Sequence, residues 1–299
     1  MEQLRKRSWF SKKVFKRINL KALAVVSGLL FYIFDGMQSR FYYILEIQYL
    51  GFRYHGWQEQ PRVITVQKMM VKTLNWVLPN SKNKVLASGR TDAMVSVNHT
   101  FVEIFTTQEI VDLDDFLGLF NQNLPADIRA LSIQETNKDF NIIQSPKIKE
   151  YHYYFSFGDK FHPYCAAFMC NIQDELDISL MQKAARLFEG EKDFYSYTFR
   201  PNPETQTVGH VIACELIENT ELKASFFPEK SYVVKFKGLG FKRNQIRLMM
   251  GVLFELGKHE LSWDEFLKTL DGKNKITLTY VAPASGLHLD NVEFLNEDE

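Results

Sequence analysis

The chain has 299 residues, 45% of them hydrophobic and 24% charged, which is typical of a globular protein with a sizeable buried core. Its 36 Lys and Arg residues balance 36 Asp and Glu residues, so its net charge does not indicate a strongly basic or acidic partner. Three cysteines are too few for a disulfide framework, which favours a reducing, cytoplasmic compartment.

The charge is unevenly distributed along the chain. Residues 1–40 carry nine Lys or Arg and two acidic residues, so the remainder carries 27 basic and 34 acidic residues, a net charge of −7. A segment with this net negative charge does not bind nucleic acid through its overall charge. Any RNA-binding surface must therefore be a local basic patch on an acidic protein.

The N-terminal segment imitates a secretion signal, with a basic stretch over residues 5–21 followed by 13 uncharged residues, 22–34. This uncharged run is shorter than the roughly 20 residues that a membrane-spanning helix needs. Met37 precedes the first convincing strand by four residues. We therefore expect residues 1–36 to be an extension upstream of the true start, with no role at a membrane.

Strand and helix patterns alternate from residue 41 onward. In the first half, strands are predicted at 41–49, 85–88, 100–106, 128–133 and 151–157, and helices at 65–78 and 112–121. Val66, Met69, Met70, Thr73 and Val77 recur at helical spacing, and Pro79 ends that helix.

The second half repeats this order of elements. A helix is predicted from Ser179 to a cap at Gly190, and a second one over 243–256. Ser262 and Glu265 have the spacing of a capping box, which predicts another helix start. Strands are predicted at 211–218, 232–237 and 292–295.

These patterns predict an α+β fold with two similar mixed α/β lobes. Antiparallel-rich sheets are expected to meet at a central catalytic cleft. The expected division is an N-terminal extension of residues 1–36, an N-terminal lobe of residues 37–158 and a C-terminal lobe of residues 159–299. The halves share no visible sequence repeat, so their similarity rests on the order of elements alone.

The loop Gly89-Arg90-Thr91-Asp92-Ala93 lies between two predicted strands and concentrates a guanidinium, a hydroxyl and a carboxylate. These five residues alone fit a solvated surface turn better than a reactive site, because short motifs often arise by chance. Their sequence nevertheless resembles the catalytic loop of TruA-type tRNA pseudouridine synthases.

Six further segments resemble that family, in the same order along the chain. They are Tyr54-His55-Gly56-Trp57-Gln58 with Thr65-Val66-Gln67, Asn123-Leu124-Pro125-x-Asp127-Ile128, Lys149-x-Tyr151-x-Tyr153, Gly190-x-x-Asp193-Phe194, Gly238-x-Gly240-Phe241 with Asn244-x-x-Arg247 and Gly251, and Ala282-Pro283-Ala284-x-Gly286-Leu287. Seven segments in order over about residues 41–294 identify the chain as a member, although each is weak by itself.

The resemblance implies an isomerase that converts uridine to pseudouridine in the anticodon arm of tRNA, without metal or organic cofactor. Asp92 corresponds to the covalent catalyst and Arg247 to its cationic partner. Tyr151 corresponds to the residue that stacks near the target base and assists proton removal from C5, and Arg90 to the one that holds the flipped nucleotide. A homodimer that binds tRNA is also implied, and Lys147, Lys149, Lys242 and Arg243 are candidate phosphate contacts.

Four positions depart from the family pattern. Met94 stands where a glycine is usual, Ser96 where a histidine is usual, and Ile143 and Gly209 where arginines are expected. These changes predict altered or weaker engagement of tRNA. Two alternatives therefore stay open: an inactive paralogue that only binds RNA, and a synthase that acts on a different structured RNA.

Overall fold

The computed structural model describes residues 41–295. The expected extension of residues 1–36 and the expected start at Met37 lie outside the described residues. No helix among residues 41–295 combines the length and the apolar character needed to cross a lipid bilayer.

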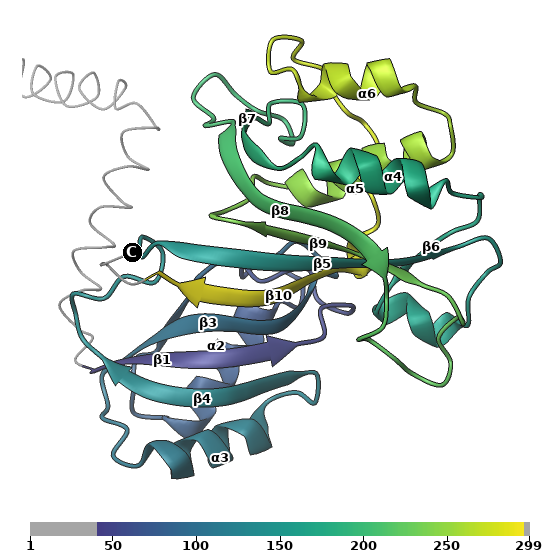
Figure 1. The fold of residues 1–299 in the computed structure, drawn as a ribbon. Helices are drawn as coiled ribbons and strands as arrows, with labels where there is room; N and C mark the ends of the chain where they lie inside the picture. The colour runs from purple at the N-terminus through teal and green to yellow at the C-terminus, as the bar shows by residue number, and fades with distance from the viewer. Residues whose placement is uncertain (1–40, 296–299) are drawn as a thin grey trace, which may run out of the picture.

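A ten-stranded sheet runs through the whole molecule (Figure 1), in the order β4-β1-β3-β10-β5-β9-β8-β7, with β2 on β3 and β6 on β5. The strands are β1 (Phe41–Tyr49), β2 (Lys84–Ala87), β3 (Ser96–Thr106), β4 (Ile128–Thr136), β5 (Lys147–Phe157), β6 (Cys170–Ile172), β7 (Gly190–Asp193), β8 (Val208–Glu218), β9 (Tyr232–Gly238) and β10 (Leu287–Phe294).

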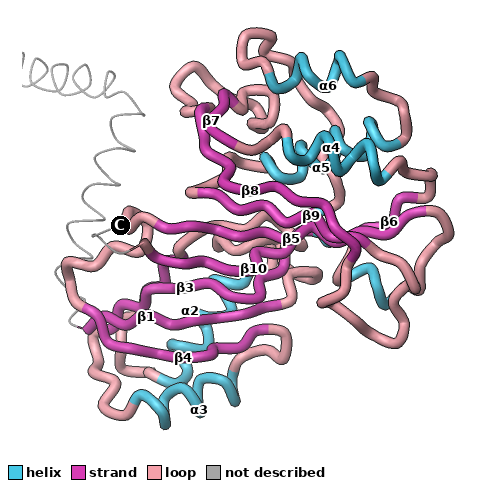
Figure 2. Tube along the Cα trace, viewed as in Figure 1, coloured by secondary structure: helices cyan, strands magenta, loops and turns pink. Residues whose placement is uncertain are grey.

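The last strand joins the two halves of the sheet. β10 pairs with β3 in parallel through His288 and Leu289, and with β5 in antiparallel register from Leu287 to Phe294. Most other pairs are antiparallel, as predicted. The strands of the two expected lobes therefore form one continuous surface, which Figure 2 shows in magenta.

Helices gather in two groups, one near each end of the sheet (Figure 1). Beside β1 and β4 are α2 (Val66–Val77) and α3 (Leu113–Asn123), and beside β7 to β9 are α4 (Ile178–Arg186), α5 (Gln245–Gly257) and α6 (Trp263–Leu270). Two short 3₁₀ turns lie at Pro163–Ala167 and Ala284–Gly286. The α5 helix is buried over most of its surface, because Phe254 packs against Tyr153 and Phe155 of β5 while α4 and α6 contact the helix as well.

The mixed α/β fold and most of the predicted elements are confirmed, including the capping box of Ser262 and Glu265 at the start of α6. The prediction that Gly190 caps the end of the α4 helix is wrong. The α4 helix ends at Arg186, because the chain turns there to bury Phe188, and Gly190 instead begins β7 with φ of +93°.

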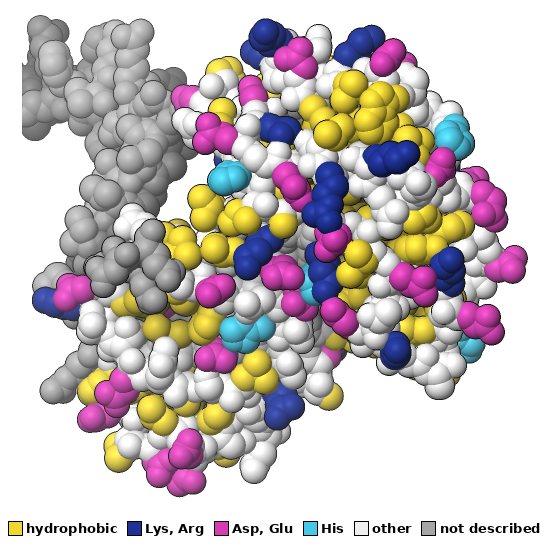
Figure 3. Space-filling model, viewed as in Figure 1, with side chains coloured by type: hydrophobic (Ala, Val, Ile, Leu, Met, Phe, Trp, Pro, Cys, Tyr) yellow, Lys and Arg dark blue, Asp and Glu magenta, His cyan; other side chains and the backbone are white. Residues whose placement is uncertain are grey.

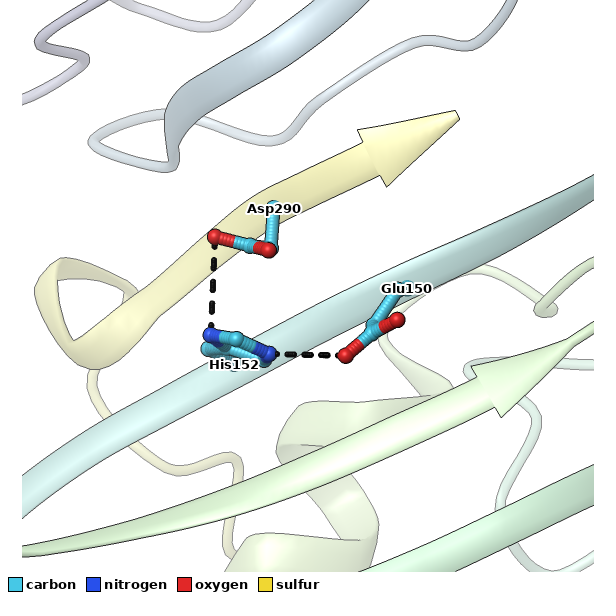
Figure 4. Close-up of side chains that lie close together, drawn as sticks. All are labelled: Glu150, His152 and Asp290. Carbon is cyan, nitrogen blue, oxygen red and sulfur yellow. Dashed lines mark hydrogen bonds and ion pairs between the residues drawn. The ribbon is translucent and has the colours of Figure 1, made fainter. Parts of the chain in front are cut away.

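Alternate residues of β5 face opposite sides of the sheet. On the side seen in Figure 1, acidic and basic side chains mix across the middle of the surface (Figure 3). Buried His152 places Nε2 3.0 Å from Glu150 and Nδ1 3.5 Å from Asp290 of β10 (Figure 4). Since the two nitrogens face different carboxylates, the ring bridges β5 and β10. The absence of a metal from the protein stays a prediction.

Candidate active site

A cleft of about 1130 Å³ opens on the other side of β5, between the loop after β2 and the start of α5. The four site residues expected from the sequence, Arg90, Asp92, Tyr151 and Arg247, all line it. The structure therefore brings together residues that are separated by up to 157 positions in the chain, from Arg90 to Arg247.

The loop that carries Asp92 is fixed by backbone contacts with the segment after β1. The Trp57 amide donates to the Thr91 carbonyl at 3.2 Å, and the Met94 amide donates to the Tyr54 carbonyl at 3.0 Å. The Thr91 hydroxyl also bonds the Tyr49 hydroxyl at 2.8 Å. A side chain at Gly56 would come within 2.7 Å of the Thr91 carbonyl, which explains the glycine there.

Asp127 holds that supporting segment in place. Its carboxylate accepts hydrogen bonds from the Tyr54 hydroxyl at 2.6 Å and from Arg53 Nη2 at 2.9 Å, and Arg53 Nε forms a further ion pair with it. Arg53 and Tyr54 hold the pKa of Asp127 below its ordinary value, although burial acts in the opposite direction. The sequence places Asp127 within a motif but does not reveal its role, because its partners, Tyr54 and Arg53, are 73 and 74 positions away.

Arg247 reaches Asp92 from the first turn of α5. Its Nη1 lies 3.8 Å from Asp92 Oδ2, and the two side chains are 17% and 37% exposed. The predicted ion pair is therefore present, at a length that leaves the carboxylate open to the cleft. Burial lowers the pKa of the Arg247 guanidinium, while the nearby carboxylate acts to raise it.

The C-terminal segment aims the Arg247 side chain. Arg247 Nε donates to the Ala282 carbonyl at 2.8 Å, and Nη1 lies 3.3 Å from Oδ1 of Asn244. The α5 helix approaches this segment closely, since a side chain at Gly251 would meet the Tyr280 carbonyl at 2.3 Å. Asn244 precedes the helix in a left-handed conformation, with φ of +58°.

Tyr151 forms an apolar wall of the cleft on β5. It is 9% exposed, and its ring meets Phe241 edge to face at a centroid distance of 5.4 Å. Burial, followed by the negative charge of Asp92, raises the pKa of the Tyr151 phenol. The group is therefore a neutral phenol at neutral pH. Tyr153, which the sequence favoured as a core residue, is fully buried and donates to the Pro283 carbonyl at 2.8 Å.

The cleft is the basic patch that the sequence required. Among the described residues that line it, Asp92 is the one carboxylate, whereas five are cationic: Arg90, Lys149, Lys242, Arg243 and Arg247. Three of the four candidate phosphate-binding residues, Lys149, Lys242 and Arg243, thus line the cleft. Lys147 is not among them, because its amine is buried and donates to the Ile142 carbonyl.

Two of the unusual residues lie in or beside the loop that carries Asp92. Met94 lines the cleft and adopts φ of +67°, a backbone conformation that costs a non-glycine residue about 1 kcal/mol. Ser96 is buried, and its hydroxyl accepts from the Gly51 amide at 2.9 Å, so it stabilises the loop and does not face the substrate space.

The two missing arginines have different surroundings. Ile143 is 54% exposed and lies outside the cleft lining. Gly209 lies on β8, where an added side chain would come within 3.8 Å of Lys242 Cε. Lys242 lines the cleft, so a cation is still present next to Gly209.

Comparisons with known proteins show the family of the chain. The family model described as tRNA pseudouridine synthase matches residues 184–294. A protein named tRNA pseudouridine synthase A 1 from Protochlamydia amoebophila is 30% identical over 256 residues, covering 86% of this chain and 97% of the relative.

Two further relatives are both named tRNA pseudouridine synthase A. The one from Pelobacter propionicus is 30% identical over 84% of this chain and 98% of its own length. The one from Chlamydia muridarum is 30% identical over 83% of this chain and 90% of its own length. The chain therefore belongs to the tRNA pseudouridine synthase family.

Proposed function

We propose that Asp92 is the covalent catalyst by which this enzyme isomerises uridine to pseudouridine in the anticodon arm of tRNA. The reaction breaks the bond between ribose C1′ and uracil N1 and forms a bond from C1′ to C5. The C5 proton is lost and N1 gains a proton, so atoms balance without any redox partner. The single observation that carries the proposal is the cleft in which one carboxylate lies among five cations.

An ionised carboxylate is a competent nucleophile for such chemistry. Arg247 is proposed to orient the Asp92 carboxylate, since its guanidinium is the charged group that meets it. The 3.8 Å separation leaves an oxygen of Asp92 free to attack. Attack at ribose C1′ and attack at uracil C6 both fit this arrangement.

The target base must leave its stack to reach Asp92, at a cost of a few kcal/mol. Arg90 is exposed at the rim and is proposed to hold the nucleotide out of its stack. Tyr151 is proposed to stack against the base. Its raised pKa argues against a phenolate that removes the C5 proton without help.

Release of tritium from tRNA labelled with [5-³H]uridine tests the function, because the label leaves C5 only when the new bond forms. The wild type is expected to release tritium. Asp92→Ala and the isosteric Asp92→Asn are expected to release none, while still binding tRNA. Release by Asp92→Asn at the wild-type rate would contradict the proposed role of this carboxylate.

The remaining expectations are also proposals. We propose a homodimer in which one tRNA contacts both subunits, which light scattering of the free and tRNA-bound enzyme tests. A lobe division near residue 158 and a cytoplasmic location are proposed too, the latter supported by three free, buried cysteines. No observation favours the inactive paralogue or a different RNA over tRNA isomerisation.

A further inference from the structure

Lys149 lines the same cleft as Asp92 and Tyr151. It precedes Tyr151 by two residues on the same face of β5, which places the two Cα atoms about 7 Å apart. Its amine rests against Gly89, since a side chain at Gly89 would come within 2.5 Å of Lys149 Nζ. The ammonium group is therefore beside the start of the catalytic loop, next to Arg90.

The ammonium group of Lys149 has no hydrogen-bond or ion-pair partner among residues 41–295. Three other lysines that are partly or fully buried do have partners. Lys147 donates to backbone carbonyls, Lys235 pairs with Glu221 at 2.7 Å, and Lys258 pairs with Asp174 at 3.1 Å. A partly buried cation without an acceptor is unfavourable, so this arrangement favours a ligand that brings negative charge.

The surroundings of Lys149 are cationic. The ionisable groups near it are Lys147 and Tyr151 on β5, Arg90 and Asp92 in the catalytic loop, and His55, Lys242, Arg243 and Arg247 elsewhere in the cleft. Its strand neighbours, Gly238 of β9 and Val292 of β10, carry no charge. Burial, with a smaller effect of Lys147, lowers the pKa of Lys149 to about 8.

We propose that Lys149 binds a backbone phosphate of the RNA at the target nucleotide. This inference rests on the proposed function, because it assumes that the uracil lies between Asp92 and Tyr151. Lys149 is then two residues along β5 from Tyr151, the residue proposed to stack on the base. This separation suits the distance from a base to its sugar–phosphate backbone. Phosphates are also the anions that every RNA nucleotide supplies, and a lysine ammonium binds them as a point charge.

Binding of a tRNA transcript tests this inference without any turnover. Asp92→Ala is compared with Asp92→Ala/Lys149→Gln over a range of salt concentrations. The second change is expected to raise the Kd about tenfold, as expected for the loss of one charged hydrogen bond. The slope of log Kd against log salt is expected to fall by about 0.7 to 0.9, the value for one phosphate contact. Lys183→Gln, an exposed change on α4, is the matched control and is expected to alter neither quantity.

The pH dependence of binding separates a charge contact from a structural effect. Raising the pH from 7 to 9 deprotonates Lys149, so the Asp92→Ala protein is expected to bind more weakly at pH 9. Asp92→Ala/Lys149→Arg keeps its charge and is expected to show a smaller loss. Equal losses in both proteins would overturn the proposal.

Measurements of kcat and KM test the inference further. With Asp92 intact, Lys149→Gln is expected to affect mainly KM. A loss confined to kcat would overturn the proposal, because it would place Lys149 at the reacting base. An unchanged salt slope would overturn it as well. If the wild type releases no tritium while the binding difference persists, the proposed isomerisation fails and the phosphate contact stands.

Discussion

The two faces of β5 differ in how completely their charged groups are paired. On the surface side, His152 contacts both Glu150 and Asp290, and this cluster ties β5 to β10 (Figure 4). On the cleft side, Lys149 has no acceptor among the described residues, and Asp92 meets Arg247 only at 3.8 Å. We therefore propose that neighbouring residues of this strand serve stability on one face and substrate binding on the other.

Replacing Arg247 tests the cleft face with the largest expected effect. Arg247→Met leaves Asp92 without its cationic partner, and we expect tritium release to fall by about 10²- to 10³-fold, the usual scale for loss of an aligned charged group. Stopped assays at saturating tRNA measure kcat. Circular dichroism checks the fold, because the lost bond to Ala282 also affects α5. Release within about threefold of wild type would contradict the pairing role.

Replacing His152 tests the surface face. His152→Ala leaves Glu150 and Asp290 close together without the ring between them. We expect the free energy of unfolding to fall by about 1–3 kcal/mol, with no change in the tritium-release rate of the folded enzyme. Denaturant titration and the release assay measure the two quantities. Unchanged stability with reduced activity would reverse the assignment of the two faces.

Replacing Lys149 by an apolar residue gives the smallest expected effect, a pH-dependent gain in stability. The pKa of Lys149 is about 8 in the folded state, below its ordinary value of 10.5. Between these values the unfolded chain binds more protons, so the wild type gains stability as pH rises through this window. Below pH 8 the cost of the buried charge is fully present. Lys149→Met is therefore expected to be more stable than wild type at pH 7, by a margin that shrinks by pH 10.

Urea titrations of the two proteins at pH 7 and pH 10 measure this margin. The comparison uses the difference between the proteins, because buried tyrosines and other groups also titrate in this range. An equal margin at both pH values would show that the charge of Lys149 carries no cost. The charged groups on the cleft face of β5 would then be no less completely paired than those on the surface face.

Local patterns in the sequence predicted most of the elements. Helical spacing placed α2, and the Ser262–Glu265 capping box placed the start of α6. The junction of β10 with both β3 and β5 was not predicted, because it joins segments up to 192 positions apart and leaves no local signal. The strand β7 was not predicted for a related reason. Its four residues form a strand because they pair with β8, which the local sequence does not indicate.

The candidate site was predictable only through resemblance to the family. Composition and spacing fitted Asp92 to an ordinary turn. The supporting contacts could not be read from the chain, because Asp127 acts through Tyr54, and Ala282 aims Arg247 through its backbone carbonyl. That Lys149 lacks an acceptor within residues 41–295 was equally hidden, since it depends on what the fold does not bring near it.

Mapping of pseudouridine in total RNA tests the central claim most directly. Cells of the native host that lack this protein are compared with cells that carry the wild type or Asp92→Asn. We expect at least one pseudouridine of the tRNA anticodon arm to disappear without the protein, and to return with the wild type but not with Asp92→Asn. Unchanged pseudouridine at every tRNA position would contradict the account.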